Sequence, residues 1–201
     1  MSKIISILGS GFSSLSAACY LSREGHDVTI YEKNKTFGGR ATQMTHKGYK
    51  FDIGPSWYWM PDVFERFFGD FDQKVSDYYT LTKLDPGYQV YFGASDSVLI
   101  SANLDKIYAL FEAEQKGSSI QLKEFLRIAE NNYNVAVKDL VYNPGVSPLE
   151  LITPKTITKL NQLFFSIRKQ VKKNFSNPRL IKILEFPVLF LGAKPSNTPA
   201  M

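Results

Sequence analysis

The 201-residue chain has few of the residues from which disulfide frameworks and metal sites are built. Its single cysteine, Cys19, excludes an internal disulfide and is typical of a reducing compartment. Its two histidines, His26 and His46, are too few and too isolated for a metal site. No apolar run approaches the roughly 18 residues that a membrane-spanning helix needs. No Ser/His/Asp or Cys/His grouping indicates nucleophilic catalysis, so no catalytic residue is assigned. We expect a cytoplasmic protein.

Positive charge is concentrated in the second part of the chain, although the net charge is only +5. Residues 1–116 carry 12 Lys/Arg and 14 Asp/Glu, whereas residues 117–201 carry 12 Lys/Arg and 5 Asp/Glu. Such an excess suggests an anionic partner, either a phosphate polymer or lipid headgroups. Because no nucleic-acid-binding motif accompanies the basic residues, we favour peripheral membrane contact over nucleic acid.

Periodicity and turn residues predict an α/β organisation. A strand, a glycine turn, a helix, a second strand and a second glycine turn fill residues 3–40. The pattern then predicts a strand at 47–54, a helix at 61–68, a small antiparallel sheet within 79–100, and helices at 103–116, 120–142, 154–173 and 177–186. The helix at 154–173 is basic and amphipathic. Its apolar face is expected either to contact a membrane or to face the core.

The sequence of the first glycine turn, Gly9 to Ser14, predicts a phosphate-binding site. Gly9 allows a sharp turn out of the first strand, and Gly11 lets backbone N–H groups approach a pyrophosphate. The following helix directs its positive N-terminal end at the same place. Glu32 ends the second strand, where a carboxylate accepts hydrogen bonds from a ribose. Ser14 stands where the fingerprint has Gly or Ala, and it is small enough for tight packing.

Two further segments resemble a known family. Gly38-Gly39-Arg40 is similar to the second glycine turn of FAD-dependent oxidoreductases of the amine oxidase and carotenoid desaturase type. Phe-Asp-Ile-Gly-Pro-Ser at 51–56 narrows the resemblance to bacterial-type phytoene desaturases. The resemblance implies an FAD cofactor held by residues from both turns and their flanks: Gly9, Ser10, Gly11, Phe12, Ser13, Ser14, Glu32, Lys33, Gly38, Gly39, Arg40, Gly54, Pro55 and Ser56. Residues 57–60 are expected to line a tunnel for a polyene or to pack in the core.

The resemblance also implies the reaction, which is dehydrogenation of an acyclic carotenoid such as phytoene, with the hydride passed to the flavin. Family members are much longer, so we expect an N-terminal portion: an FAD-binding segment at 1–60, a β-rich substrate-domain segment at 61–117 and a basic helical segment at 118–201. A missing C-terminal part would be needed to complete the flavin site. A redox-neutral carotenoid isomerase or saturase and a non-catalytic, membrane-associated fragment are the alternatives.

Overall fold

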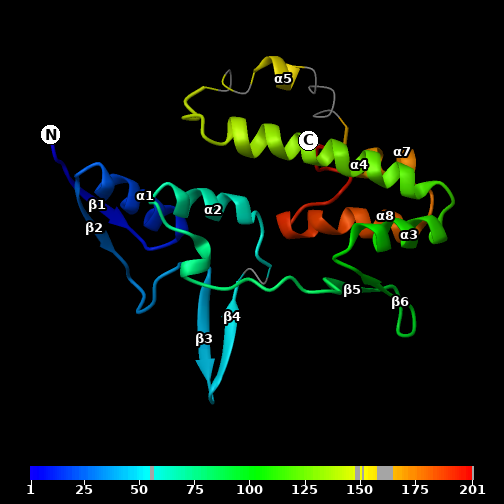
Figure 1. Cartoon of the computed structure of the whole chain (residues 1–201), viewed down its shortest axis with the longest axis horizontal. Helices are drawn as coiled ribbons and strands as arrows, with labels where there is room; N and C mark the ends of the chain where they lie inside the picture. The colour runs from blue at the N-terminus through cyan, green and yellow to red at the C-terminus, as the bar shows by residue number, and fades with distance from the viewer. Residues whose placement is uncertain (55–56, 148–149, 151, 158–164, 201) are drawn as a thin grey trace. The chain divides into compact units, whose positions relative to one another are not determined.

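The computed structural model describes residues 1–54, 57–147, 150, 152–157 and 165–200 (Figure 1). The chain divides into two compact units, Met1–Leu81 and Thr82–Met201. The small sheets alternate with helices, so the predicted α/β class is confirmed. No helix in the described part of the chain is long and apolar enough to cross a bilayer.

The first unit begins with a βαβ arrangement. Strands β1 (Ile4–Leu8) and β2 (Asp27–Tyr31) pair in parallel from Ile4 opposite Asp27 to Leu8 opposite Tyr31, and helix α1 (Phe12–Arg23) makes the crossover. The partly buried side chains alternate with exposed ones along both strands, and α1 packs against both. The face of this sheet that lies away from α1 is open, since Ile4 and Leu8 are 85% and 83% exposed.

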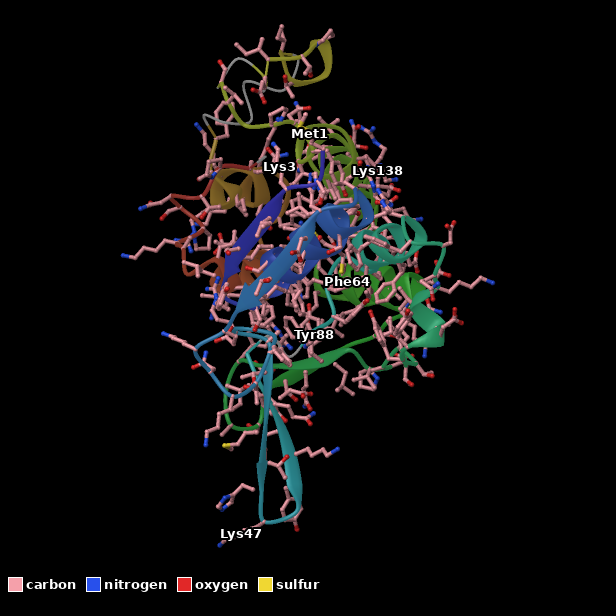
Figure 2. The ribbon with its side chains drawn as sticks, turned by 90° about the vertical axis from the view of Figure 1, so that its left-hand side faces the viewer. Met1, Lys3, Lys47, Phe64, Tyr88 and Lys138 are labelled. Carbon is pink, nitrogen blue, oxygen red and sulfur yellow. The ribbon has the colours of Figure 1, made fainter. Side chains whose placement is uncertain are left out.

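A hairpin follows the βαβ arrangement. Strands β3 (Thr42–His46) and β4 (Tyr49–Ile53) pair in antiparallel fashion, and Lys47 marks the tip of this projecting arm in Figure 2. The predicted strand at 47–54 is confirmed as β4. Its partner β3 was not predicted because the sequence Thr-Gln-Met-Thr-His has little apolar alternation.

Aromatic packing holds helix α2 (Pro61–Gly69) beside α1 in the first unit. The Tyr20 ring contacts Phe67 and Phe71 at centroid distances of 5.8 and 5.1 Å. The Tyr20 hydroxyl also donates a 2.6 Å hydrogen bond to Asp70. A short 3₁₀ turn, η1 (Val75–Asp77), follows, and residues 79–82 form no strand, contrary to the prediction. In the described part of the chain, no strand pairs with these residues.

The second unit is mainly helical. A hairpin of β5 (Tyr88–Tyr91) and β6 (Ser97–Ile100) precedes α3 (Leu104–Glu114) and α4 (Ser118–Tyr133), and α4 continues as the π-helix η2 (Asn134–Leu140). The remaining elements in the described part of this unit are α5 (Pro154–Ile157), α7 (Ile167–Asn174), α8 (Pro178–Glu185) and the 3₁₀-helix η4 (Phe186–Leu191). Their shared core comprises Val98, Ile100, Phe111, Leu122, Val171, Phe175, Leu180 and Ile183.

The prediction of one continuous helix at 154–173 is wrong. Ser166 is extended, accepts a hydrogen bond from the backbone N–H of Lys169 and so begins α7 as a separate helix. Ser166 also forms a β-bridge with Pro199. Residues 158–164, which carry much of the predicted apolar face, lie outside the described residues. Val171, on the part of that face in α7, is fully buried and faces the core, whereas Ile157, on the part in α5, is 53% exposed.

Candidate functional site

The candidate site forms where β1 ends and α1 begins. Gly9 has a φ of +93°, a conformation that favours glycine, and its N–H donates a 2.7 Å hydrogen bond to the carbonyl of Tyr31. The chain therefore turns sharply at the end of the paired strands. Gly11 is the N-cap of α1, and no side chain of the described residues caps this helix start. First-turn N–H groups lack intrahelical partners, so they are available to an anion.

Gly11 leaves room for a ligand. Its φ is −72°, which any residue adopts, and a Cβ placed on it would meet no atom within 4 Å. The protein itself therefore does not require a glycine at this position. An open backbone surface beside the helix start fits the close approach of a pyrophosphate. This is the feature by which the residues present fit a dinucleotide.

The second glycine turn packs directly on the first. The Gly38 N–H donates a 2.9 Å hydrogen bond to the Ser10 carbonyl, and Gly38 forms a parallel β-bridge with Gly11. A Cβ on Gly39 would lie 3.1 Å from the Gly11 Cα atom. A Cβ on Gly38 would lie only 2.4 Å from a backbone oxygen, that of Ala41. Both glycines also have positive φ angles; the path of the second turn requires Gly38, and its close contact with the first turn favours Gly39.

Glu32 connects the second strand to the first glycine turn. Its Oε2 accepts hydrogen bonds from the backbone N–H and the hydroxyl of Ser10, at 2.8 and 2.7 Å, and its Oε1 accepts one from the backbone N–H of Asn34 at 2.8 Å. The Asn34 and Ser10 hydrogen bonds lower the pKa of Glu32 to about 2. The carboxylate is therefore ionised at neutral pH and orders the turn. Its predicted contact with a ribose stays a prediction.

The structure brings most of the predicted site residues to one place. The two turns and Glu32 are joined by the contacts above, and a Cβ on Gly54 would lie 2.2 Å from the Arg40 carbonyl oxygen, so the end of β4 adjoins the second turn. Phe12 instead packs edge-on against Phe64 at 6.1 Å, beside α2. Ser13, Lys33 and Arg40 are exposed, Ser14 is half-buried, and Pro55 and Ser56 lie outside the described residues.

One contribution to this site had no sequence signal, and one predicted segment differs from its expectation. Asn34 was not predicted, because it helps to hold Glu32 through its backbone N–H, which every non-proline residue has. Trp57, Tyr58, Trp59 and Met60 are all exposed, so the expectation of core packing is wrong for them. The rings of Trp57 and Trp59 stack at 6.4 Å. Their role beside a polyene stays a prediction.

Comparison with known proteins agrees with this geometry. The family described as NAD(P)-binding Rossmann-like domain matches residues 7–73, which include both glycine turns, so this part of the chain is similar to dinucleotide-binding domains. A carotenoid 3,4-desaturase of Haloarcula japonica is 36% identical over 200 residues, 98% of this chain and 40% of that protein. A 4,4'-diapophytoene desaturase of Staphylococcus haemolyticus is 32% identical over 199 residues, again 98% of this chain and 40% of that protein.

Solved structures share the fold at lower identity. An oxidoreductase from Methanosarcina mazei matches all of this chain and 41% of its own length, with 16% identity and a TM-score of 0.55. A putrescine oxidase matches 99% of this chain and 40% of its own length, with 19% identity and a TM-score of 0.52. The chain thus spans about two-fifths of the curated relatives it matches. The predicted resemblance to carotenoid desaturases is confirmed.

Proposed function

We propose that this chain, a relative of carotenoid desaturases over the N-terminal 40% of their length, supplies the dinucleotide-binding part of an FAD-dependent carotenoid desaturase. The proposed reaction is dehydrogenation of an acyclic carotenoid such as phytoene. The observation that carries the proposal is the pairing of the two glycine turns beside an uncapped helix start, with the open position at Gly11 between them.

The second glycine turn favours FAD over a nicotinamide dinucleotide. The first turn alone is shared by both cofactor classes. The second turn, with Arg40 next to Gly39, resembles flavoenzymes, and the similar desaturases match along the same residues. Among the described residues the Arg40 side chain has no ion-pair partner, so its guanidinium is available to fork to phosphate oxygens.

Several residues of the chain would hold the cofactor, each in a different way. First-turn N–H groups of α1 bind the pyrophosphate, and Gly11 lets it come close. Glu32 keeps the turn in the binding conformation through its contacts with Ser10. When bound, FAD supplies a hydride acceptor, so that a saturated C–C bond beside a polyene loses a hydride and, from the neighbouring carbon, a proton. The exposed indoles of Trp57 and Trp59 offer apolar surface to a polyene.

A chimera tests this proposal. This chain would replace the matched segment of the Haloarcula japonica desaturase, and the carotenoids formed in cells that make a suitable substrate would be analysed by absorption and mass. We expect a product with two fewer hydrogen atoms per new double bond and a longer absorption wavelength. A second chimera carrying Gly11→Val is the control, because its larger side chain at the open position blocks the cofactor.

Other results of the chimera experiment would indicate a different reaction or a different cofactor. Products of unchanged mass with altered double-bond geometry would indicate a redox-neutral isomerase, and products that gain hydrogen would indicate a saturase. A folded chimera that binds no flavin would overturn the assignment of FAD. For the 201-residue chain by itself we expect weak flavin binding or none, since the two-stranded sheet that carries the first glycine turn is open on one face, where Ile4 and Leu8 are exposed. A stoichiometric flavin absorption band in the purified chain would contradict that expectation.

A further inference from the structure

Ser10 lies at the centre of the contacts that join the parts of the candidate site. Among residues 1–54 and 57–81, which the structure describes in the first unit, Ser10 alone is buried, with 1% of its surface exposed. Its backbone N–H and its hydroxyl donate to Glu32 Oε2 at 2.8 and 2.7 Å. Its carbonyl accepts the hydrogen bond from the Gly38 N–H at 2.9 Å. Ser10 therefore connects the first glycine turn both to the end of β2 and to the second glycine turn.

The hydroxyl is the only one of these groups that distinguishes serine from other residues. Every residue except proline has a backbone N–H and a carbonyl, so the bond from Gly38 and the N–H bond to Glu32 do not depend on the side chain. The hydroxyl bond to Glu32 does. Substitution of Ser10 by alanine thus removes a single contact and leaves the backbone contact between the two turns in place.

That contact helps to fix the orientation of the Glu32 carboxylate. The two bonds from Ser10 occupy both acceptor positions of Oε2, and the Asn34 N–H occupies one position of Oε1 at 2.8 Å. Among the described residues, the second position of Oε1 has no partner. Rotation about the last side-chain bond of a glutamate is only loosely restricted, so these three hydrogen bonds set the plane of the carboxylate. The open acceptor position on Oε1 is therefore held in one direction.

The same hydrogen bonds keep this oxygen charged. The bonds from Asn34 and Ser10 lower the pKa of Glu32 to about 2, and an ionised carboxylate accepts stronger hydrogen bonds than a neutral carboxyl group. In dinucleotide-binding folds the acid at the end of the second strand binds the ribose 2′-hydroxyl, which is a hydrogen-bond donor. Ser10 offers a ligand almost no surface of its own, because it is 1% exposed.

We propose that Ser10 is a positioning residue for the dinucleotide, whose buried hydroxyl orients the Glu32 carboxylate so that Oε1 accepts a hydrogen bond from the ribose 2′-hydroxyl. This inference rests on the proposed function, since it requires a dinucleotide in the two glycine turns. It differs from the sequence-based prediction, in which Ser10 holds FAD directly. A ligand that lacks the 2′-hydroxyl gains nothing from the oriented oxygen.

Paired titrations with ADP and 2′-deoxy-ADP test the inference, because these ligands differ by the one hydroxyl group. The 201-residue chain would be titrated with each ligand by NMR at neutral pH. We expect the unmodified chain to bind ADP roughly 10-fold more tightly than 2′-deoxy-ADP, as for one hydrogen bond to a charged group. In Ser10→Ala the two dissociation constants should become nearly equal, because the carboxylate is no longer held toward the ribose.

Ser118→Ala is the matched control. Ser118 is also buried, at 0% exposed, and its hydroxyl donates to the Phe111 carbonyl in the second unit. Both variants should lower the urea midpoint, whereas only Ser10→Ala should change the ratio of the two dissociation constants. Carboxyl NMR gives a readout without ligand: the pKa of Glu32 should rise from about 2 toward its ordinary value in Ser10→Ala and stay the same in Ser118→Ala.

A third variant, Glu32→Ala, distinguishes action through Glu32 from direct contact with the ligand. Once the carboxylate is absent, adding Ser10→Ala should weaken ADP binding little further, because two changes that act through one group are not additive. A large further loss would show that Ser10 itself contacts the ligand and would overturn its positioning role. An unchanged ratio of dissociation constants in Ser10→Ala, or an equal fall in Ser118→Ala, would also overturn it.

The behaviour of the unmodified chain separates this inference from the proposed function. Equal binding of ADP and 2′-deoxy-ADP would overturn the inference and leave the dinucleotide site in place. No binding of ADP at millimolar concentrations would contradict the dinucleotide site of the proposed function, and the inference with it.

Discussion

Substituting Gly11 by alanine separates what the fold requires from what a dinucleotide requires. At this position φ is −72°, and a Cβ would meet no protein atom within 4 Å. Alanine restricts the unfolded chain and so gains about 0.4–1 kcal/mol, whereas glycine is the better N-cap by a similar amount. We therefore expect the free energy of unfolding of Gly11→Ala to stay within about 0.5 kcal/mol of the unmodified chain.

Ligand binding should respond very differently. The added methyl group stands where a pyrophosphate approaches the backbone, so at least one N–H contact to a charged phosphate oxygen is lost. Such a bond contributes about 1.5–3 kcal/mol, which corresponds to about 10- to 150-fold in the dissociation constant. NMR titration of the chain with ADP measures this loss even when binding is weak, and urea unfolding of the same samples measures stability.

Gly38→Ala is the matched comparison, because the same methyl group there would lie 2.4 Å from the Ala41 carbonyl oxygen at a φ of +101°. It should lower the free energy of unfolding by about 1–3 kcal/mol. Unchanged ADP titration of Gly11→Ala would refute the assignment of the phosphate to this turn. Strong destabilisation of Gly11→Ala would refute the claim that its position is open.

Three further substitutions test other parts of the structure. Glu32→Gln should lower the free energy of unfolding at pH 7. Because the folded pKa of Glu32 is lowered to about 2, the carboxylate contributes stability above pH 4.5 and loses that contribution as the pH falls toward 2. The urea midpoint of the variant should therefore vary less between pH 4.5 and 2 than that of the unmodified chain. Phe111→Ala should cost about 3–5 kcal/mol in urea unfolding, since the ring is 1% exposed and packs edge-on against Phe175. Asn103→Ala should lower the free energy of unfolding by about 0.5–2 kcal/mol in the same measurement, because the Asn103 side chain caps α3 by accepting a hydrogen bond from the backbone N–H of Asp105.

Local chemistry determined how much of the fold was predictable. The first strand, the turn and α1 were predicted because apolar alternation, Gly9 and the helical run act within a few residues. The break at Ser166 was not, because it depends on a bridge to Pro199 far along the chain. The strand predicted at 79–82 is absent for a related reason, since β-forming residues make a strand only where a partner strand lies beside them.

The same distinction applies inside the candidate site. A glycine in the fingerprint can be required by the path of the backbone or by the close approach of a ligand, and the sequence alone cannot separate these two constraints. Gly9, Gly38 and Gly39 have positive φ angles, so the path of the backbone requires them with or without a ligand. Gly11 has an ordinary φ and open space in front of its Cα atom, so the fold does not require a glycine there, and the approach of a ligand stays the hypothesis for it. The backbone angles and the space at each Cα atom, which only the structure shows, assign each glycine to one constraint or the other. Gly11 is therefore the position at which the dinucleotide hypothesis is tested most directly, because a single methyl group there should weaken binding about 10- to 150-fold and spare the fold.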